Sequence, residues 1–121
     1  MNRIAALAGS IAGALAVAAG AFGAHALRTT LDAGAMQIWH TAVEYQLWHA
    51  LALLACAPIP PSRWTRASIV AFCVGISLFC GSLYALALGA PRAVGAVTPL
   101  GGLTLISGWC CLGAAFWRTA K

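Results

Sequence analysis

Charged residues are scarce in this chain, and their scarcity is the first constraint on its fold. Only 7% of the 121 residues are charged, whereas 62% are hydrophobic. Soluble domains carry roughly 25% charged residues, so a chain this depleted could not cover a water-facing surface with polar groups. We therefore expect lipid to surround it.

Acidic residues are rarer still, with two Asp and Glu against seven Lys and Arg and a formal net charge of +5. The basic residues are scattered through short connections, whereas a nucleic-acid surface gathers them on one face. This pattern argues against nucleic-acid binding. In the connections, basic side chains can contact anionic headgroups, so membrane lipids are the expected partners.

Familiar catalytic constellations are absent as well. The sequence has no paired carboxylates, nucleophile elbow, phosphate-binding Walker loop or zinc-type histidine motif. Its five cysteines, an odd number, all lie inside apolar runs, as inert reduced thiols do. We expect a protein that is not an enzyme, with no metal site and no cofactor. Haem held by histidine pairs is the redox alternative.

Long apolar runs are what the sequence has in abundance. A helix needs about 20 predominantly apolar residues to cross the hydrocarbon core. Four runs reach that length, at about 4–24, 36–56, 67–88 and 99–117. The first is longer than the apolar part of a cleaved signal peptide, so we expect it to be a true span. The chain is predicted to be all-α, a single membrane domain over 1–121 folded as a four-helix bundle.

Helix-start signals and basic residues refine this topology. Thr98 is predicted to cap the fourth helix, with Pro99 at its first position. With four spans, the termini and the second connection share one side, which carries Arg3, Arg63, Arg66, Arg118 and Lys121. The other side carries Arg28 and Arg92. The positive-inside rule then places both termini on the cytoplasmic side.

Small residues crowd the first and fourth spans. They include six glycines expected at helix contacts: Gly9, Gly13, Gly20, Gly101, Gly102 and Gly108. Small residues let the backbones of two membrane helices approach closely. The pair Gly9 and Gly13 predicts packing inside the bundle, with a dimer face as the alternative.

The second span, by contrast, is rich in polar side chains. On a helical wheel, only a stripe of five residues is apolar enough to face lipid: Trp39, Val43, Leu47, Ala50 and Leu54. We therefore expect its polar side chains to turn into the bundle. His40 and Glu44 lie one turn apart and can touch, either as a neutral acid with a neutral imidazole or as a charged pair. His25 is expected near the same end of the bundle, as an interface group or a neighbour of His40. Hydrogen-bond partners for the centre are expected from Ser77, Tyr84, Thr104 and Ser107.

Three uses for these polar groups stay open: a clamp between helices, a ligand or transport role, and a haem or metal site. Ionisable side chains inside a membrane are costly and often serve proton relays, ligands or metals. The plainer interpretation is a clamp, in which hydrogen bonds of roughly 1 kcal/mol each pin one helix to another.

Four stretches, in order along the chain, carry a family resemblance: "GAFGAHAL", "WHTAVEYQLWHALALL", "GSLYALAL" and "TPLGGLTLISGW". Together they resemble the family of small four-helix membrane proteins typified by YgdD and YwdK, which has bacterial and eukaryotic members and no known function. The resemblance implies a location in the bacterial inner membrane and shifts weight to five polar residues: His25, Tyr45, Gln46, His49 and Tyr84.

These observations predict a non-enzymatic membrane module that acts through helix contacts or binds a small lipidic or polar ligand. Candidate residues are His25, His40, Glu44, Tyr45, Gln46, His49 and Tyr84. A second copy or another membrane protein is a further expected partner. The alternative function is a small oligomeric transporter or proton-coupled channel that uses His40 and Glu44.

Overall fold

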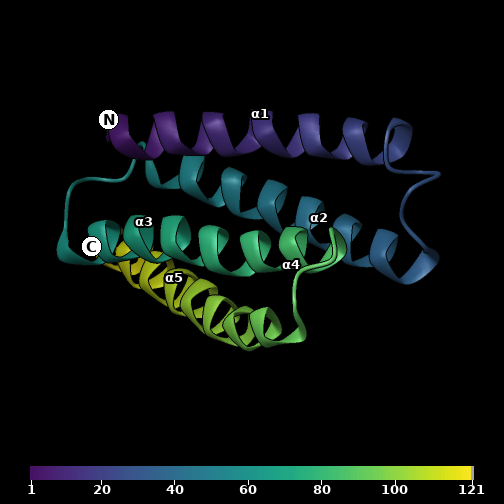
Figure 1. Ribbon diagram of the computed structural model, residues 1–121. Helices are drawn as coiled ribbons and strands as arrows, with labels where there is room; N and C mark the ends of the chain where they lie inside the picture. The colour runs from purple at the N-terminus through teal and green to yellow at the C-terminus, as the bar shows by residue number, and fades with distance from the viewer. Residues whose placement is uncertain (121) are drawn as a thin grey trace.

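The computed structural model describes residues 1–120, and over that range it contains helices and no strands. Two long helices come first: α1 at Arg3–His25 and α2 at Ala33–Cys56. A third rod combines α3 at Arg63–Gly75, the π-helical turn η1 at Ile76–Cys80 and α4 at Gly81–Ala87. The 3-10 helix η2 at Arg92–Ala96 leads into α5 at Val97–Thr119. The predicted all-helical fold is confirmed (Figure 1).

Three of the long helices, α1, residues 63–87 and residues 92–119, have the length and apolar composition to cross a membrane. Helix α2 has 24 residues and is of similar length, but its polar side chains leave it less apolar than those three. It packs against both its sequence neighbours, α1 on one side and the α3–η1–α4 rod on the other. The most polar helix is therefore flanked by the two more apolar ones.

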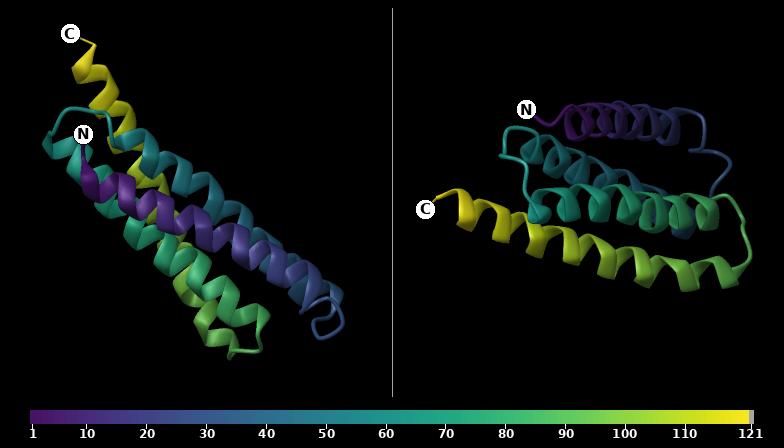
Figure 2. Two further views of the ribbon diagram at one scale, coloured as in Figure 1. Left: turned by 90° about the horizontal axis from the view of Figure 1, so that it is seen from above. Right: turned by 90° about the vertical axis from the view of Figure 1, so that its left-hand side faces the viewer.

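The helices run up and down in sequence order, and both termini lie at one end of an elongated bundle (Figures 1 and 2). Helix α1 packs mainly on α2, and α5 packs on α3 and η1. The main core lies between α2, α3 and α5, around buried Leu53, Phe72 and Leu105. A smaller cluster around Trp39 and Leu27 fills the far end.

Side-chain caps explain where three helices begin. The side chains of Asn2, Asp32 and Ser62 accept hydrogen bonds from the backbone N–H groups of Ala5, Ala35 and Thr65. The prediction that Thr98 caps the fourth helix is wrong. Helix α5 begins at Val97, directly after η2, and has no side-chain cap. Because Thr98 lies inside the helix, its hydroxyl is free to bond Ser82 on α4, at 2.7 Å.

Two glycines mark the closest helix crossings. A Cβ on Gly9 would lie 2.9 Å from the carbonyl oxygen of Ala50 on α2, and one on Gly101 would lie 2.7 Å from Cα of Phe79. Backbone atoms cannot yield to a side chain there, so both crossings need glycine. The Gly9 face is covered by α2 and not left free for a dimer. Gly108 supports the ring of Phe72, Gly20 faces Val43, and Gly13 and Gly102 make ordinary contacts with Ala50 and Phe79.

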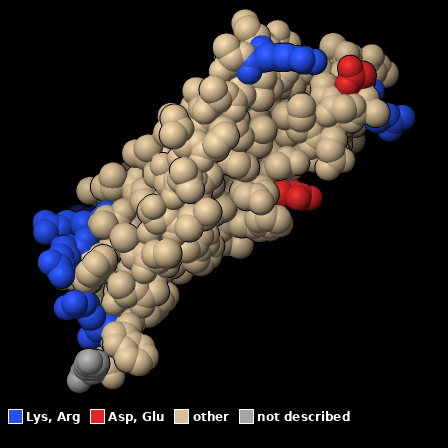
Figure 3. All heavy atoms as spheres, turned by 90° about the horizontal axis from the view of Figure 1, so that it is seen from below, with Lys and Arg blue, Asp and Glu red and all other residues tan. Residues whose placement is uncertain are grey.

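Basic side chains gather at the two ends of the bundle, and one acidic side chain interrupts the long uncharged surface between them (Figure 3). At the end that holds the termini, the guanidinium groups of Arg63 and Arg118 lie over the Trp64 ring, 5.0 Å and 5.7 Å from its centroid. Lys121, which counted in the sequence-based orientation, lies outside the described residues. Which end faces the cytoplasm remains a prediction.

Candidate functional site

The orientation predicted for α2 is wrong for part of its polar face. His40 and Glu44 are both exposed, as is Gln37 one turn before them. Much of the stripe that was expected to face lipid instead meets α1: Trp39 rests on Gly23, Val43 on Gly20, and Leu54 on Gly9. Leu47 is exposed, as expected. The physical reason is size, because the small residues of α1 leave room for bulky apolar side chains.

Trp39 fixes this contact at the far end of the bundle. Its side chain is buried, and the indole Nε1 donates a hydrogen bond of 2.9 Å to the carbonyl oxygen of Ala19 on α1. Its ring also meets the Tyr84 ring edge-on, with centroids 4.7 Å apart. One aromatic side chain of α2 therefore joins α1 to α4.

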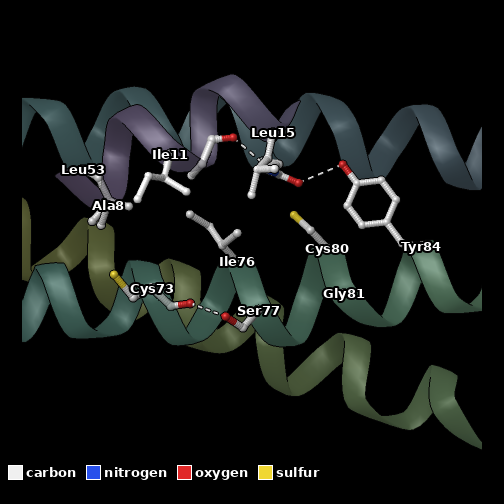
Figure 4. Close-up of a pocket in the computed structure, with 12 residues that line it drawn as sticks. Ala8, Ile11, Leu15, Leu53, Cys73, Ile76, Ser77, Cys80, Gly81 and Tyr84 are labelled. Atoms are coloured by element: carbon white, nitrogen blue, oxygen red, sulfur yellow. Dashed lines mark hydrogen bonds between the residues drawn. The ribbon is translucent and has the colours of Figure 1, made fainter. Parts of the chain in front are cut away.

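Gln46 forms the second link, at the middle of the bundle. Its amide Nε2 donates to the carbonyl oxygen of Ala12 at 2.9 Å, and its Oε1 accepts from the Tyr84 hydroxyl at 2.8 Å. Gln46 thus hydrogen-bonds to α1 and α4 at once. These bonds border a cavity of about 400 Å³ between α1, α2 and the α3–η1–α4 rod, into which Tyr84 points (Figure 4).

His49 forms the third link, towards α5. Its Nδ1 lies 2.6 Å from the carbonyl oxygen of Tyr45, and the Trp109 indole donates to its Nε2 at 3.0 Å. A carbonyl can only accept and an indole N–H can only donate, so the imidazole is neutral with its proton on Nδ1. In this state both ring nitrogens have a partner.

An apolar groove lies beside His49, between α2 and α5. It has a volume of about 850 Å³ and is walled largely by aromatic side chains: Tyr45, Trp48, Phe79, Trp109 and Phe116. The ring centroids of Tyr45 and Phe79 are 4.7 Å apart, so two of its lining rings contact each other. Phe79 belongs to the π-helical turn η1, a type of turn often found at functional sites.

The structure thus brings four of the seven candidate residues, Tyr45, Gln46, His49 and Tyr84, into the interior, and leaves the other three outside. His25 is exposed at the end of α1, and no hydrogen bond joins it to His40 within residues 1–120. His40 and Glu44 likewise have no hydrogen bond or ion pair in that range, even with each other. A charged side chain at the centre of a membrane helix costs about 2.5–3.5 kcal/mol. No group within residues 1–120 offsets that cost for a charged Glu44.

The structure also contains polar contacts that the sequence did not predict. Ser68 donates to the carbonyl oxygen of Gly108 at 3.0 Å, and Ser82 bonds Thr98, so these serines join the third rod to α5. The expectation that Ser77, Thr104 and Ser107 fill the centre is wrong, because each bonds a carbonyl of its own helix four residues earlier. A usable signal existed: Ser68 and Ser82 share one face with Phe72, Gly75 and Phe79, at alternating spacings of four and three.

Among the described residues, no three His, Cys, Asp or Glu side chains come close enough to share a metal ion. The polar interior consists of hydrogen bonds between helices, and these lie beside the cavity and the groove described above. Chemically, it can hold helices together and accept an apolar ligand.

Comparisons with known proteins place this geometry in context. Residues 19–102 match the family described as "Protein of unknown function (DUF423)". The chain is 42% identical over 106 residues to the UPF0382 inner membrane protein YgdD of Escherichia coli K12, covering 85% of this chain and 81% of that one. It is also 42% identical over 106 residues to the UPF0382 membrane protein YwdK of Bacillus subtilis 168, covering 84% and 85%. For the UPF0382 membrane protein SSP2132 of Staphylococcus saprophyticus, the identity is 42% and the shares are 86% and 88%. No solved structure matches the chain.

Proposed function

The chain belongs to the DUF423 family of membrane proteins of unknown function and is an integral protein of the bacterial inner membrane, where we propose that it acts as a non-enzymatic module. In this proposal it binds a lipid chain or a similar apolar ligand in the groove between α2 and α5.

The groove is the observation that carries this proposal. Its volume of about 850 Å³ lies within the range of roughly 300–1,000 Å³ typical of ligand sites. Aromatic side chains offer a ligand a large apolar contact area at little cost in side-chain entropy. Two polar groups of the lining residues, the His49 imidazole and the Trp109 indole, already bond each other, and the lining is otherwise largely apolar. An apolar ligand therefore suits the site better than a polar one.

The same hydrogen bonds support a non-enzymatic role. A general base needs a free nitrogen or oxygen within reach of the proton that it takes from a substrate. Both ring nitrogens of His49 are occupied, and Gln46 and Tyr84 bond each other. The interior polar groups thus act on neighbouring helices.

A substitution that fills the groove with a side chain tests the proposal. Gly102 lines the groove, and a Cβ there meets only the Phe79 ring at ordinary distance, so Gly102→Leu would place a side chain inside it. Gly113→Leu is the matched control, since Gly113 lies on the same helix and nothing surrounds it within 4 Å. Native mass spectrometry of protein released from membranes should show a retained lipid or apolar ligand in the wild type and the control. In Gly102→Leu, its occupancy should fall by about tenfold. Equal retention in all three proteins would reject the groove as a binding site.

Glu44 favours a second candidate, a proton-coupled channel. An ionisable group at mid-helix is a common element of proton paths, and His40 lies one turn away. Liposomes holding an internal pH dye should acidify faster with wild-type protein than with Glu44→Gln. A leak equal to that of empty liposomes would exclude this candidate.

We also propose that both termini face the cytoplasm. The end that holds them carries Arg3, Arg63, Arg66 and Arg118, whereas the opposite connections carry Arg28 and Arg92. Basic residues at this end can contact anionic headgroups of the inner leaflet. Alkaline phosphatase fused to the C-terminus should be inactive and green fluorescent protein should fluoresce, and the reverse result would invert the topology.

A further inference from the structure

The outward face of α2 has a polar group with no place in the ligand groove. Glu44, the only glutamate, lies at the midpoint of the 24-residue helix Ala33–Cys56. It is exposed, and no group within residues 1–120 bonds its carboxylate. A carboxylate at this depth is costly in hydrocarbon unless it is paired, and residues 1–120 supply no pair for it.

The exposed residues of this face follow a heptad spacing. They are Gln37, His40, Glu44, Leu47, Leu51 and Leu54, with intervals of three and four that alternate without a break. All six are exposed, although Leu54 also contacts Gly9 of α1 at the edge of the stripe. Alternating intervals of three and four are the pattern by which two helices wind around each other with interlocking side chains. Within residues 1–120, Gln37, His40, Glu44 and Leu47 of this stripe are exposed, Leu51 borders the groove, and Leu54 meets α1 at the edge, so most of the pattern lacks a partner.

The face is also complementary to itself. It carries an imidazole and, one turn further, a carboxylate. Two copies with the same orientation in the membrane are related by a two-fold axis along the membrane normal, so their α2 helices run parallel. In a parallel heptad pair, a side chain at one core position inserts beside the next core position of the opposite helix. His40 would then lie beside the partner's Glu44, and the same contact would occur twice.

We propose that a second copy of this chain docks on the outer face of α2 through this heptad. The leucines in its second half, Leu47, Leu51 and Leu54, pack against their counterparts, while His40 and Glu44 bond across the interface. A different membrane protein would need its own matching base and acid, whereas a second copy supplies both. The inference does not depend on a ligand in the groove. Leu51 borders both the groove and the proposed interface, so the second copy would form one side of the groove.

Complementary variants test the pairing across copies. Glu44→His gives a chain with two histidines on the face, and His40→Glu gives a chain with two acids, so neither can pair with itself. When the two are made together with different tags, each histidine again meets an acid in trans. Pairing within one helix cannot account for such a rescue, because each variant helix carries two groups of the same kind.

The expected result is that wild-type copies with different tags co-purify in mild detergent and appear as a dimer by native mass spectrometry. Each variant expressed alone should lose about tenfold or more of the co-purified fraction. The two variants together should recover most of it, which also shows that neither is simply misfolded. A wild-type protein that is monomeric in lipid nanodiscs, or a mixed pair no better than the single variants, would overturn the proposal.

A crosslinking measurement decides the matter if the variants do not accumulate. Leu47→Cys places a thiol on the heptad, and Leu103→Cys places one on an exposed position of α5. Mild oxidation in native membranes should give more dimer than wild type for Leu47→Cys only. Equal crosslinking of both variants would contradict a specific α2 interface.

Discussion

Helix α2 carries the same kinds of side chain on two faces, and the fold uses them differently. On the inner face, Trp39, Gln46 and His49 each bond a neighbouring helix. A residue of identical type to each of these is exposed: Gln37 and His40 on the outer face, and Trp48 at the groove between α2 and α5. Inside, each of the three side chains has a hydrogen-bond partner on a neighbouring helix. The exposed side chains make no hydrogen bond within residues 1–120.

This contrast separates stability from association. Hydrogen bonds between membrane helices contribute on average about 0.6 kcal/mol and at most about 2 kcal/mol each. Three such links orient α1, α4 and α5 around α2, so the inner face should control the free energy of unfolding. The outer face should control only what binds to the finished bundle. Matched pairs of residues allow each part of the comparison to be tested.

Trp39→Ala should have the largest effect. It removes a buried ring that rests on Gly23 and bonds Ala19, and removal of a buried aromatic costs about 3–5 kcal/mol. Trp48→Ala, on the half-exposed face, should cost at most about 1 kcal/mol. Unfolding by SDS from mild detergent measures both. If the two variants lose equal stability, burial against α1 does not set Trp39 apart from Trp48.

Gln46→Leu should come next, with a loss of about 1–3 kcal/mol, because it leaves the Tyr84 hydroxyl without its acceptor. Adding Tyr84→Phe should then cost less than Tyr84→Phe costs alone, since the two side chains bond each other. Gln37→Leu is the outer-face control and should leave unfolding unchanged. Strict additivity of the two inner substitutions would contradict the hydrogen bond between them.

His49→Phe should cost about 1 kcal/mol, as it keeps the ring but leaves the Trp109 indole without an acceptor. Tryptophan fluorescence should change as well, because the Trp109 indole loses its polar partner. His40→Phe provides the comparison on the outer face and should alter neither stability nor emission of the monomer. An unchanged spectrum for His49→Phe would argue against the contact with Trp109.

Glu44→Gln should have the smallest effect on the fold, within about 0.5 kcal/mol, because no group among residues 1–120 bonds the carboxylate. The measurement requires detergent in which native mass spectrometry shows only monomers, so that lost association does not count as lost stability. A destabilisation above about 1 kcal/mol would mean that Glu44 has a partner within its own bundle.

The sequence was a good guide to the number, length and order of the helices. Hydrophobic runs report length directly, and the prolines of the second connection end a helix whatever surrounds it. It was a poor guide to which side of α2 faces its neighbours. A wheel sorts Trp39 and Glu44 onto different sectors, but it does not say which sector another helix will cover.

Composition alone determined that this chain lives in lipid, because so few charged groups cannot hydrate a surface of this size. Tertiary structure alone decided that Trp39 turns inward and Glu44 outward. The cause lies in α1, because its glycines let the bulky apolar side chains of α2 pack closely against it, whereas a carboxylate would lose its solvation there. Close packing depends on the shapes of two surfaces at once, and no single segment of sequence contains both.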